Sequence, residues 1–243
     1  CPQLNMRIEF VTSIDSTNSE LMRCAAAGDY STVCLVAQEQ TAGRGRLGRA
    51  WLSDKHSLMM SIGLPLAPKD WSGLSLAVGV SIAESLHPSI QIKWPNDLWV
   101  NGQKLAGILI ETVAIKNASP SERYAVIGIG LNLEAPAAAL TQAALDAKAS
   151  PVGLRELIPH ITSETALERL LQPLVDTLRH FEQYGWKPYA TGFAKRDALQ
   201  GLSISLSNGM TGKYAGINNV GALILQTDAG LQNIISHEVS VCL

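Results

Sequence analysis

The segment 43–49 (Gly-Arg-Gly-Arg-Leu-Gly-Arg) constrains the fold of this 243-residue chain more than any other segment. Its three glycines carry no Cβ, so the backbone there can turn sharply and approach a ligand closely. Arg44, Arg46 and Arg49 add permanently charged, fork-shaped donors that suit phosphate or carboxylate oxygens. We therefore expect a loop that binds an anion. The alternative is a solvated, arginine-rich turn without a ligand.

The glycine spacing also matches the G-x-G-x-x-G pattern of dinucleotide-binding folds. Such a fold needs a strand before the glycines, a helix directly after them and a carboxylate about 20 residues further on. The short apolar stretch 33–37 predicts the strand. No helical stripe of apolar positions follows at 50–56, and the stretch 64–67 contains no carboxylate. The context therefore disfavours a Rossmann fold.

The spacing of apolar residues predicts a chain that mixes strands and helices. A capping box at Thr17–Glu20 begins the first helix and Gly28 ends it, while Asn101-Gly102 predicts a tight hairpin. Residues 134–150 are expected to form a loop or a short helix. The expected strands are 7–12, 33–37, 57–64, 90–93, 98–100, 104–113 and 124–133. The expected helices are 18–27, 71–86, 162–184 and a shorter one at 188–196.

The pattern changes after Leu199. Short alternating runs are separated by turn residues such as Asn208-Gly209, which is typical of a small β-barrel or sandwich. The runs are 202–206, 213–217, 222–226 and 231–235. We therefore expect an α/β core over residues 1–198 and a small β domain over residues 199–243.

Composition limits the class of protein. Hydrophobic residues make up 47% of the chain and charged residues 16%, as in a packed globular protein. The net charge of −2 argues against nucleic acid as a ligand of the visible chain. No apolar run reaches the length of a membrane span, and the N-terminus lacks a signal-peptide pattern. Four cysteines and five histidines without metal-ligand spacing predict a cytoplasmic protein with no metal cage built from these side chains.

Two further segments carry polar residues at strand ends. In Lys93–Asp97 (Lys-Trp-Pro-Asn-Asp), Pro95 fixes its own φ and holds Trp94 extended, so Asn96 and Asp97 are presented rigidly. They can recognise a base edge or carry out carboxylate chemistry, or they can simply favour a turn.

Lys104 follows the predicted hairpin inside an otherwise apolar strand, so it faces an anion or is an edge-strand lysine that discourages aggregation. By strand alternation, Gly128, Gly130 and Asn132 share one face. That face either leaves room for a slender ligand or admits a closely packed helix.

Taken in order over residues 8–135, these motifs resemble the biotin–protein ligase family. The motifs are Ser16-Thr17-Asn18, Gly43–Arg49 followed by Trp51, Lys93–Asp97, Lys104–Leu109 and Gly128–Asn132. The resemblance implies an α+β fold: a class II synthetase-like core, in which a mixed β-sheet is flanked by helices, with a small C-terminal SH3-like β-barrel. It also implies an activity in which biotin and ATP form biotinyl-5′-AMP. Biotin is then transferred to a lysine of a biotin carboxyl carrier protein domain of acetyl-CoA carboxylase.

The resemblance assigns roles to individual residues. Biotin's carboxylate is already ionised at neutral pH, so its activation needs positive charge rather than a base. The expected catalytic residues are Arg46, Arg49 and Lys104, with Asp97 accepting the proton of the acceptor lysine. The expected biotin-binding residues are Ser16, Thr17, Asn18, Gln40, Gly43, Arg44, Arg46, Lys104, Gly107, Leu109, Gly128 and Gly130. The expected ATP-binding residues are Arg46, Arg49, Trp51, Asn96, Lys104 and Asn132, with Mg²⁺ bridging phosphates through ligands that the sequence does not identify.

Other interpretations stay open at this point. A lipoate–protein ligase shares the scaffold, but its Arg-Arg-x-Ser-Gly-Gly-Gly loop has no counterpart, because the chain contains no run of three glycines. A biotin-responsive transcriptional repressor would add DNA-binding helices before Cys1, and a homodimer is compatible with the family. The family tends to carry a basic residue near the C-terminus that reaches the nucleotide, and the nearest position here is Cys242.

Overall fold

The computed structural model describes residues 6–52, 54–146 and 150–241. The chain divides into two compact units: the first comprises residues 1–68 and 103–169, and the second residues 69–102 and 170–243. Each unit is therefore built from two separate stretches of sequence. The domain boundary expected between residues 198 and 199 stays a prediction.

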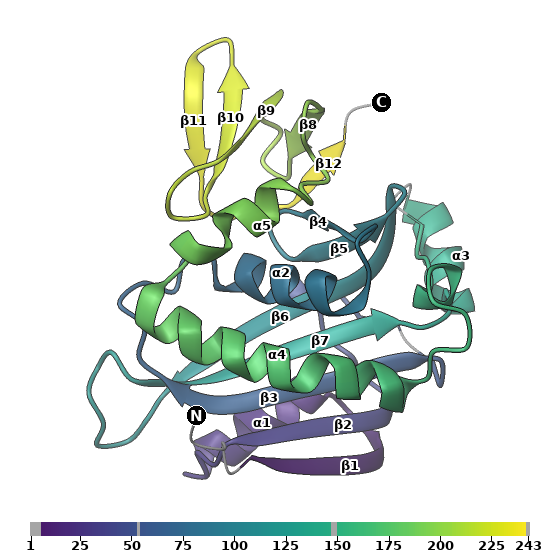
Figure 1. Ribbon diagram of the computed structural model, residues 1–243, viewed down its shortest axis with the longest axis vertical. Coiled ribbons are helices and arrows are strands. Elements are labelled where there is room, and N and C mark those ends of the chain that lie inside the picture. Colours follow the sequence, from purple (N-terminus) through teal and green to yellow (C-terminus); the bar gives the residue numbers. More distant parts are fainter. Residues whose placement is uncertain (1–5, 53, 147–149, 242–243) are drawn as a thin grey trace. The chain divides into compact units, whose positions relative to one another are not determined.

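The first unit is built on a mixed β-sheet whose strands lie in the order β1-β2-β3-β7-β6 (Figure 1). Strands β1 and β2 are parallel, whereas β2–β3, β3–β7 and β7–β6 are antiparallel. These strands span Arg7–Ile14 (β1), Val33–Gln40 (β2), Ser57–Leu66 (β3), Gln103–Ala114 (β6) and Arg123–Asn132 (β7). Every strand predicted in this unit is present, with ends shifted by at most a few residues.

Helix α1 (Thr17–Ala26) covers one face of this sheet. Its apolar side packs Leu21 and Ala25 against Tyr124 and Val126 of β7, in a core that also includes Val33 and Leu35. The expected cap was one residue late: Ser16 is the N-cap, and its Oγ accepts a hydrogen bond from Ser19 N at 3.4 Å. Ser16 has the extended backbone that a cap needs, while the Thr17 hydroxyl lies against Gln40 instead.

The remaining long helices follow the apolar pattern. Helix α2 (Leu74–Leu86) is buried on nearly all sides and begins three residues after the predicted start, because Gly73 is in the left-handed region at φ 80°. Helix α4 (Ser163–Tyr184) has its buried residues at helical spacing, as Leu170, Leu174 and Leu178 illustrate. Helix α3 (Ala137–Asp146) lies in the segment expected to be a loop or short helix, and α5 (Ala190–Ala194) is shorter than expected.

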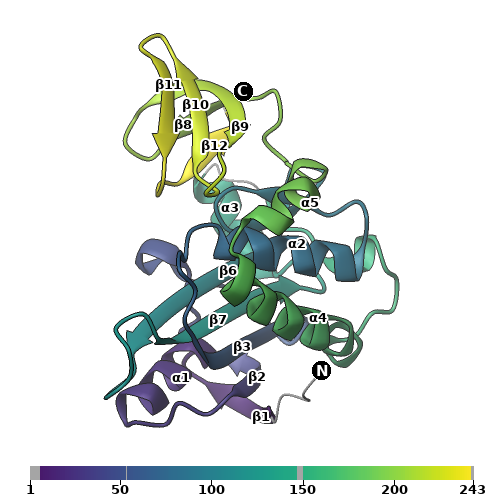
Figure 2. The ribbon, with the colours of Figure 1, turned by 60° about the vertical axis from the view of Figure 1, so that its left-hand side comes forward.

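The second unit contains a short hairpin and a separate antiparallel sheet of order β11-β10-β9-β8-β12 (Figure 2). The hairpin strands are β4 (Gln91–Lys93) and β5 (Asp97–Val100), and the sheet strands are β8 (Ser203–Leu206), β9 (Thr211–Ile217), β10 (Leu223–Thr227), β11 (Gly230–Ile234) and β12 (Val239–Val241). This sheet is consistent with the expected SH3-like domain. Its last strand was not expected, because three residues are too few to form an alternating pattern.

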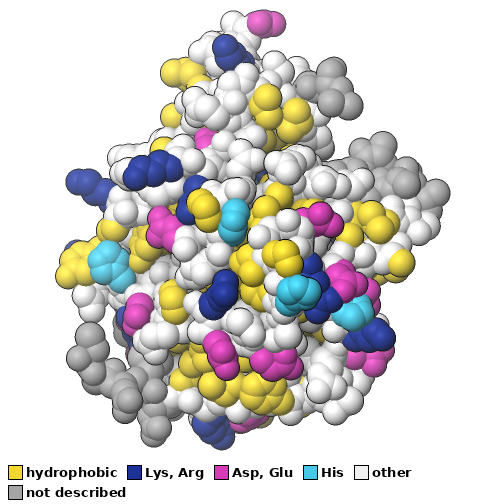
Figure 3. Space-filling model, turned by 45° about the vertical axis from the view of Figure 1, so that its right-hand side comes forward, with side chains coloured by type: hydrophobic (Ala, Val, Ile, Leu, Met, Phe, Trp, Pro, Cys, Tyr) yellow, Lys and Arg dark blue, Asp and Glu magenta, His cyan; other side chains and the backbone are white. Residues whose placement is uncertain are grey.

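Surface chemistry agrees with the composition. On the face shown in Figure 3, basic and acidic side chains are intermingled, and no continuous basic field appears there. Among the described residues, no helix is both long enough and apolar enough to span a membrane.

Candidate active site

One face of the sheet in the first unit collects many of the expected biotin-binding residues. Gly107 pairs with Gly130, and both Leu109 and Ser61 pair with Gly128. Because side chains alternate along each strand, these five positions point to the same side of the sheet. The predicted shared face of Gly128, Gly130 and Asn132 is therefore confirmed, and it extends onto β3 and β6.

The glycines on this face make room for two large side chains. A Cβ built on Gly128 would overlap the carboxamide of Asn18, which projects from the first turn of α1. A Cβ built on Gly130 would overlap the indole of Trp51, and one on Gly107 would lie 3.1 Å from that ring. The alternative interpretation, in which a helix packs closely against this strand, applies to Gly128, because Asn18 of α1 lies against it. Gly130 and Gly107 instead lie under Trp51.

A line of polar side chains crosses this face, and we call it the polar chain: Gln40, Thr17, Ser61, Asn18 and Glu111. Asn18 Nδ2 donates to Glu111 Oε2 at 2.9 Å and to the carbonyl oxygen of Leu109 at 3.2 Å. Thr17 N donates to Gln40 Oε1 at 2.8 Å. Thr17, Asn18 and Ser61 are almost completely buried, as is the neighbouring Ser16. Buried polar groups in this number need a reason, because each must be satisfied or bind something.

Counting protons fixes the direction of part of the polar chain. Ser61 Oγ lies 2.6 Å from Asn18 Oδ1 and 2.7 Å from Thr17 Oγ1, yet a hydroxyl has one proton. The oxygen of Asn18 can only accept, whereas Thr17 has a proton of its own. Ser61 therefore donates to Asn18. The single proton of the Thr17 hydroxyl has two acceptors within reach, Ser61 Oγ and Gln40 Oε1, the latter at 3.1 Å.

Residues 43–51 form a closed hairpin that we call the arginine loop. Trp51 N donates to Gly43 O at 2.9 Å, and Gly45 N donates to Arg49 O at 2.7 Å. The tip has positive φ at Leu47 (55°) as well as at the following glycine. The buried Gly43 has no space for a side chain, because a Cβ would lie 2.6 Å from Trp51 O. The predicted loop is thus a specific turn that holds three arginines close together.

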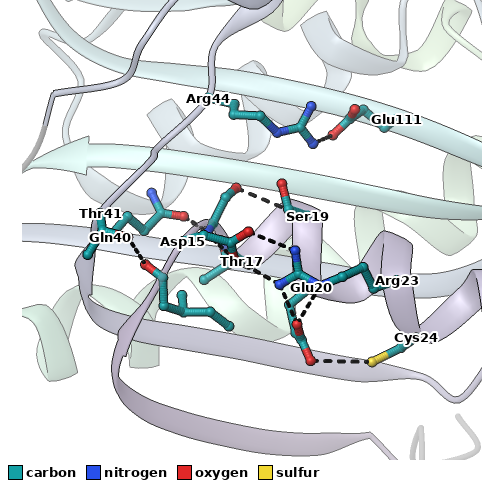
Figure 4. Close-up of polar contacts among 12 residues, drawn as sticks. Asp15, Thr17, Ser19, Glu20, Arg23, Cys24, Gln40, Thr41, Arg44 and Glu111 are labelled. Carbon is teal, nitrogen blue, oxygen red and sulfur yellow. Dashed lines mark hydrogen bonds and ion pairs between the residues drawn. The ribbon is translucent and has the colours of Figure 1, made fainter.

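The loop meets the polar chain through Arg44, whose Nη2 donates to Glu111 Oε2 at 2.7 Å (Figure 4). The Lys104 ammonium lies 5.5 Å from the centre of the Trp51 ring, which is within cation–π distance. Two buried polar atoms in this region, Asn132 Oδ1 and Trp51 Nε1, have no hydrogen-bond partner among the described residues. The first unit therefore brings together most of the predicted site residues.

The structure places Asn96 and Asp97 in the second unit, where the turn between β4 and β5 carries them. The Trp94–Pro95 peptide bond in this turn is cis. Lys93 and Trp94 are buried, and each donates to a backbone carbonyl: Lys93 Nζ to Val239 O at 2.6 Å, and Trp94 Nε1 to Gly221 O at 3.0 Å. Two of the five residues of this motif therefore bind the C-terminal part of the chain.

Comparison with known proteins puts this arrangement in context. The model of the biotin/lipoate A/B protein ligase family matches residues 10–132, half of the chain. The bifunctional ligase/repressor BirA of Escherichia coli is 32% identical over 241 residues, which cover 94% of this chain and 72% of that protein. The chain belongs to the biotin/lipoate A/B protein ligase family.

Two other members of this family are biotin ligases. The biotin–[acetyl-CoA-carboxylase] ligase of Mycobacterium tuberculosis is 37% identical over 139 residues, 52% of this chain and 49% of that relative, so the match spans about half of its length. The biotin protein ligase of Aquifex aeolicus, solved with biotin and ATP, is 27% identical with a TM-score of 0.77, over 97% of this chain and 98% of its own. These relatives support classification of the chain as a biotin–protein ligase, and the shared fold confirms the expected architecture.

Two residues of the site were missed from the sequence. Ser61 is a polar residue in the middle of the buried strand β3, and this position is the sequence signal that could have identified it. Glu111 ends the segment Lys104–Glu111, but only the fold shows that Asn18 and Arg44 both bind it.

The N-terminus of α1, which presents the polar chain, is held by an ion-pair cluster (Figure 4). Arg23 pairs with Asp15 at 2.7 Å and also binds Glu20. Hydrogen bonding to Arg23 lowers the pKa of Asp15 to about 2, and Ser16 N also donates to this carboxylate. A carboxylate at this end of the helix also complements the helix dipole.

The described cysteines behave as structural thiols. Burial raises the pKa of Cys34 to about 12, and it also raises the pKa of Cys24, so neither is an activated nucleophile. Both are free. Cys242, the expected departure from the family pattern, lies outside the described residues. In the described part of the chain, no three His, Cys, Asp or Glu side chains are grouped as a metal site.

Proposed function

We propose that this protein activates biotin with ATP and transfers it to a lysine of a carrier domain. In the first step the biotin carboxylate attacks the α-phosphorus of ATP, giving biotinyl-5′-AMP and pyrophosphate. In the second step the lysine amine attacks the activated carbonyl, forming an amide and releasing AMP. The observation that carries the proposal is the contact between the buried polar chain and the arginine loop, because it joins a line of hydroxyl and amide groups to a loop that carries three arginines.

The polar chain suits biotin's ureido ring, which presents two N–H donors and one carbonyl acceptor. Ser16, Thr17 and Gln40 offer hydroxyl and amide groups for it, and the backbone of Arg44 adds a donor. The proton count above leaves Thr17 Oγ1 with lone pairs for a ligand N–H. The apolar valeryl chain suits the strip along Gly107 and Leu109, provided that the Trp51 ring, which covers Gly107, moves aside. Biotin's carboxylate then extends toward the arginine loop.

Adenylation brings a carboxylate against a triphosphate, so it depends on stabilising negative charge. Arg46, Arg49 and Lys104 supply that charge in our proposal. Mg²⁺ prefers phosphate oxygens and water plus one or two carboxylates. We propose that the ion enters the site with ATP, held by the phosphates of the nucleotide.

Adenine is proposed to lie against Trp51, with Asn132 reading its edge, and the expected contribution of Asn96 stays a prediction. The unpartnered Asn132 Oδ1 and Trp51 Nε1 support this assignment, because a base supplies the missing donor and acceptor. For the transfer step, we propose that Asp97 accepts the proton of the attacking lysine, whose ordinary pKa is about 10.4. The carrier domain, the cytoplasmic location and a homodimer are further parts of the proposal.

A mixed anhydride hydrolyses when water reaches it, so the intermediate must be covered until the lysine arrives. The arginine loop has the hinge chemistry for this role, because its glycines allow the backbone to change conformation. We expect the amides of residues 43–51 to exchange hydrogen rapidly in the empty enzyme and slowly with biotin plus ATP. Strong protection that ligand leaves unchanged would contradict gating.

Calorimetry with biotin, lipoate and ATP tests the proposal. Biotin should bind the empty enzyme with measurable heat, ATP should bind more tightly after biotin, and lipoate should give no signal. Binding of lipoate in place of biotin would favour the lipoate–protein ligase interpretation. The additional repressor function stays a prediction, and a DNA-binding assay on the intact gene product tests it.

A further inference from the structure

Glu111 is out of place in a site that must hold two anions. Its carboxylate lies on the ligand-facing side of β6, on a site expected to bind both biotin's carboxylate and a triphosphate. A bare negative charge there would oppose both ligands. Such a residue needs a role that outweighs this repulsion, and its contacts supply one.

A single oxygen of Glu111 joins two parts of the chain that are remote in sequence. Oε2 accepts from Asn18 Nδ2 at 2.9 Å and from Arg44 Nη2 at 2.7 Å. Asn18 belongs to α1, and Arg44 belongs to the arginine loop. The Glu111 side chain is 26% exposed and that of Arg44 40%, so water screens the pair only in part.

This contact separates the three arginines of the loop by role. Arg44 directs its guanidinium at Glu111, which cancels the carboxylate's charge and holds the base of the loop. A guanidinium whose charge is offset in this way attracts a phosphate less strongly than an unopposed one. Arg46 and Arg49, at and after the tip of the hairpin, are left as the loop's candidates for ATP.

The same carboxylate also orients the polar chain. Glu111 and the carbonyl of Leu109 both accept from Asn18 Nδ2, so the amide oxygen of Asn18 must face Ser61. Ser61 then donates to Asn18, so the lone pairs of Ser61 Oγ face the Thr17 hydroxyl. The carboxylate of Glu111 therefore helps to orient Asn18 and, through it, the Ser61 hydroxyl that contacts Thr17.

We propose that Glu111 is a positioning residue that couples closure of the arginine loop to the orientation of the biotin-recognising groups. It acts through Arg44 on one side and through Asn18 on the other, without touching the reacting atoms. This inference rests on the proposed function. It predicts that loss of the Glu111 charge lowers the affinity for biotin and also increases the mobility of the arginine loop. The affinity for ATP, measured without biotin, should stay unchanged.

The test compares Glu111→Gln, Arg44→Gln, their double variant and Glu9→Gln. Glu9→Gln is the matched control, because it removes a carboxylate that is paired with Arg7 at 3.4 Å on β1, outside the site. We expect Glu111→Gln and Arg44→Gln each to weaken biotin binding about tenfold in calorimetry, the scale of one charge-assisted contact. Both should speed hydrogen exchange over residues 43–51 and raise AMP release without a carrier, because the intermediate leaks. The double variant should bind biotin no more weakly than the single variant with the lower affinity.

Two results would overturn the inference. One is a Glu111→Gln enzyme with parental biotin affinity and parental exchange in the loop. The other is a double variant whose defect is the product of the two single defects, since independent effects multiply. If Glu111→Gln does not fold, the partly exposed Arg44→Gln carries the test alone through the same readouts. A parental enzyme that binds no biotin would instead refute the proposed function, and loop exchange in the variants would still test the Glu111–Arg44 contact.

Discussion

The buried polar side chains have different roles in the two units. In the first unit the buried polar groups are short and uncharged, and four of them (Ser16, Thr17, Asn18 and Ser61) lie together in the site. In the second unit Lys93 and Trp94 donate directly to backbone carbonyls. A lysine or indole donor directed at a backbone carbonyl holds two segments together, whereas a line of hydroxyls and amides with unused lone pairs can exchange partners with a ligand. The partner, more than the burial, identifies the role.

A second contact in the second unit follows the structural pattern. Tyr214 Oη donates to Asp197 Oδ2 at 2.7 Å, and Leu199 N donates to the other carboxylate oxygen at 3.0 Å. Burial raises the pKa of Asp197 and also that of Tyr214. Both residues lie in the C-terminal part of the chain, where β9 contributes Tyr214 to the second sheet.

We expect the largest effect on activity from removal of charged groups in the first unit. Lys104→Ala or Arg46→Ala should slow biotinyl-5′-AMP formation by the equivalent of about 2–4 kcal/mol, because a group that offsets charge in the transition state is lost. The thermal midpoint should stay near that of the parent. Adenylate formation at the parental rate in either variant would remove that residue from the catalytic set.

In the second unit, removal of a polar group should lower the stability of the fold and leave biotin binding unchanged. Tyr214→Phe leaves the buried Asp197 carboxylate with one fewer donor, which should lower the free energy of unfolding by about 1.5–3 kcal/mol. Urea denaturation measures this, and calorimetry should find biotin affinity unchanged. A fall in biotin affinity without loss of stability would reverse the comparison.

Substitutions at two glycines of the first sheet, Gly130 in the site and Gly63 against the core, should have different effects. Gly130→Val should displace Trp51, and Gly63→Val should displace Tyr124 from the apolar core, each with overpacking on the order of 1–3 kcal/mol. We expect Gly130→Val to reduce ligand binding far more than thermal stability, and Gly63→Val to do the opposite. Equal losses in both assays for Gly130→Val would mean that Trp51 matters only for packing.

The smallest effect concerns acid stability and should differ in sign between the units. The pKa of Asp15 falls from its ordinary 3.8 to about 2 in the folded protein, so its contribution is complete above pH 4 and is lost as the pH falls toward 2. Asp15→Asn should therefore lower stability at neutral pH by about 0.2–1 kcal/mol, the value of an exposed pair, and have no effect near pH 2.

Asp197 has a raised pKa, so its contribution is complete below its ordinary value and is lost as the pH rises through the raised one. The stability of Asp197→Asn relative to the parent should therefore increase with pH. Urea unfolding across a pH series measures both aspartate variants, and parallel pH profiles would contradict the assignment.

Local patterns predicted much of this structure. Strand alternation correctly placed Gly128 and Gly130 on one face, and the turn chemistry of Asn101-Gly102 is present as two consecutive positive φ values. What lies over those glycines was not predictable, because Asn18 and Trp51 reach them from segments far away in sequence. Periodicity carries no information about such long-range approaches.

The errors have similar causes. Ser16 and Thr17 are both good helix caps, and the choice between them depends on Gln40, which the fold brings to Thr17. Glu111 looks like an ordinary polar residue on a strand until Arg44 and Asn18 meet it. The sequence motifs thus indicated the chemistry of the site, while the contacts that orient its groups required the fold.

The most direct test is to incubate the purified protein with a biotin carboxyl carrier domain, ATP, Mg²⁺ and either biotin or lipoate. Intact-mass and peptide mass spectrometry then report what is attached and where. The account predicts one biotinyl group on one lysine of the carrier, dependent on ATP, and no lipoyl group under the same conditions. An unmodified carrier, or a carrier that takes lipoate in place of biotin, would contradict it.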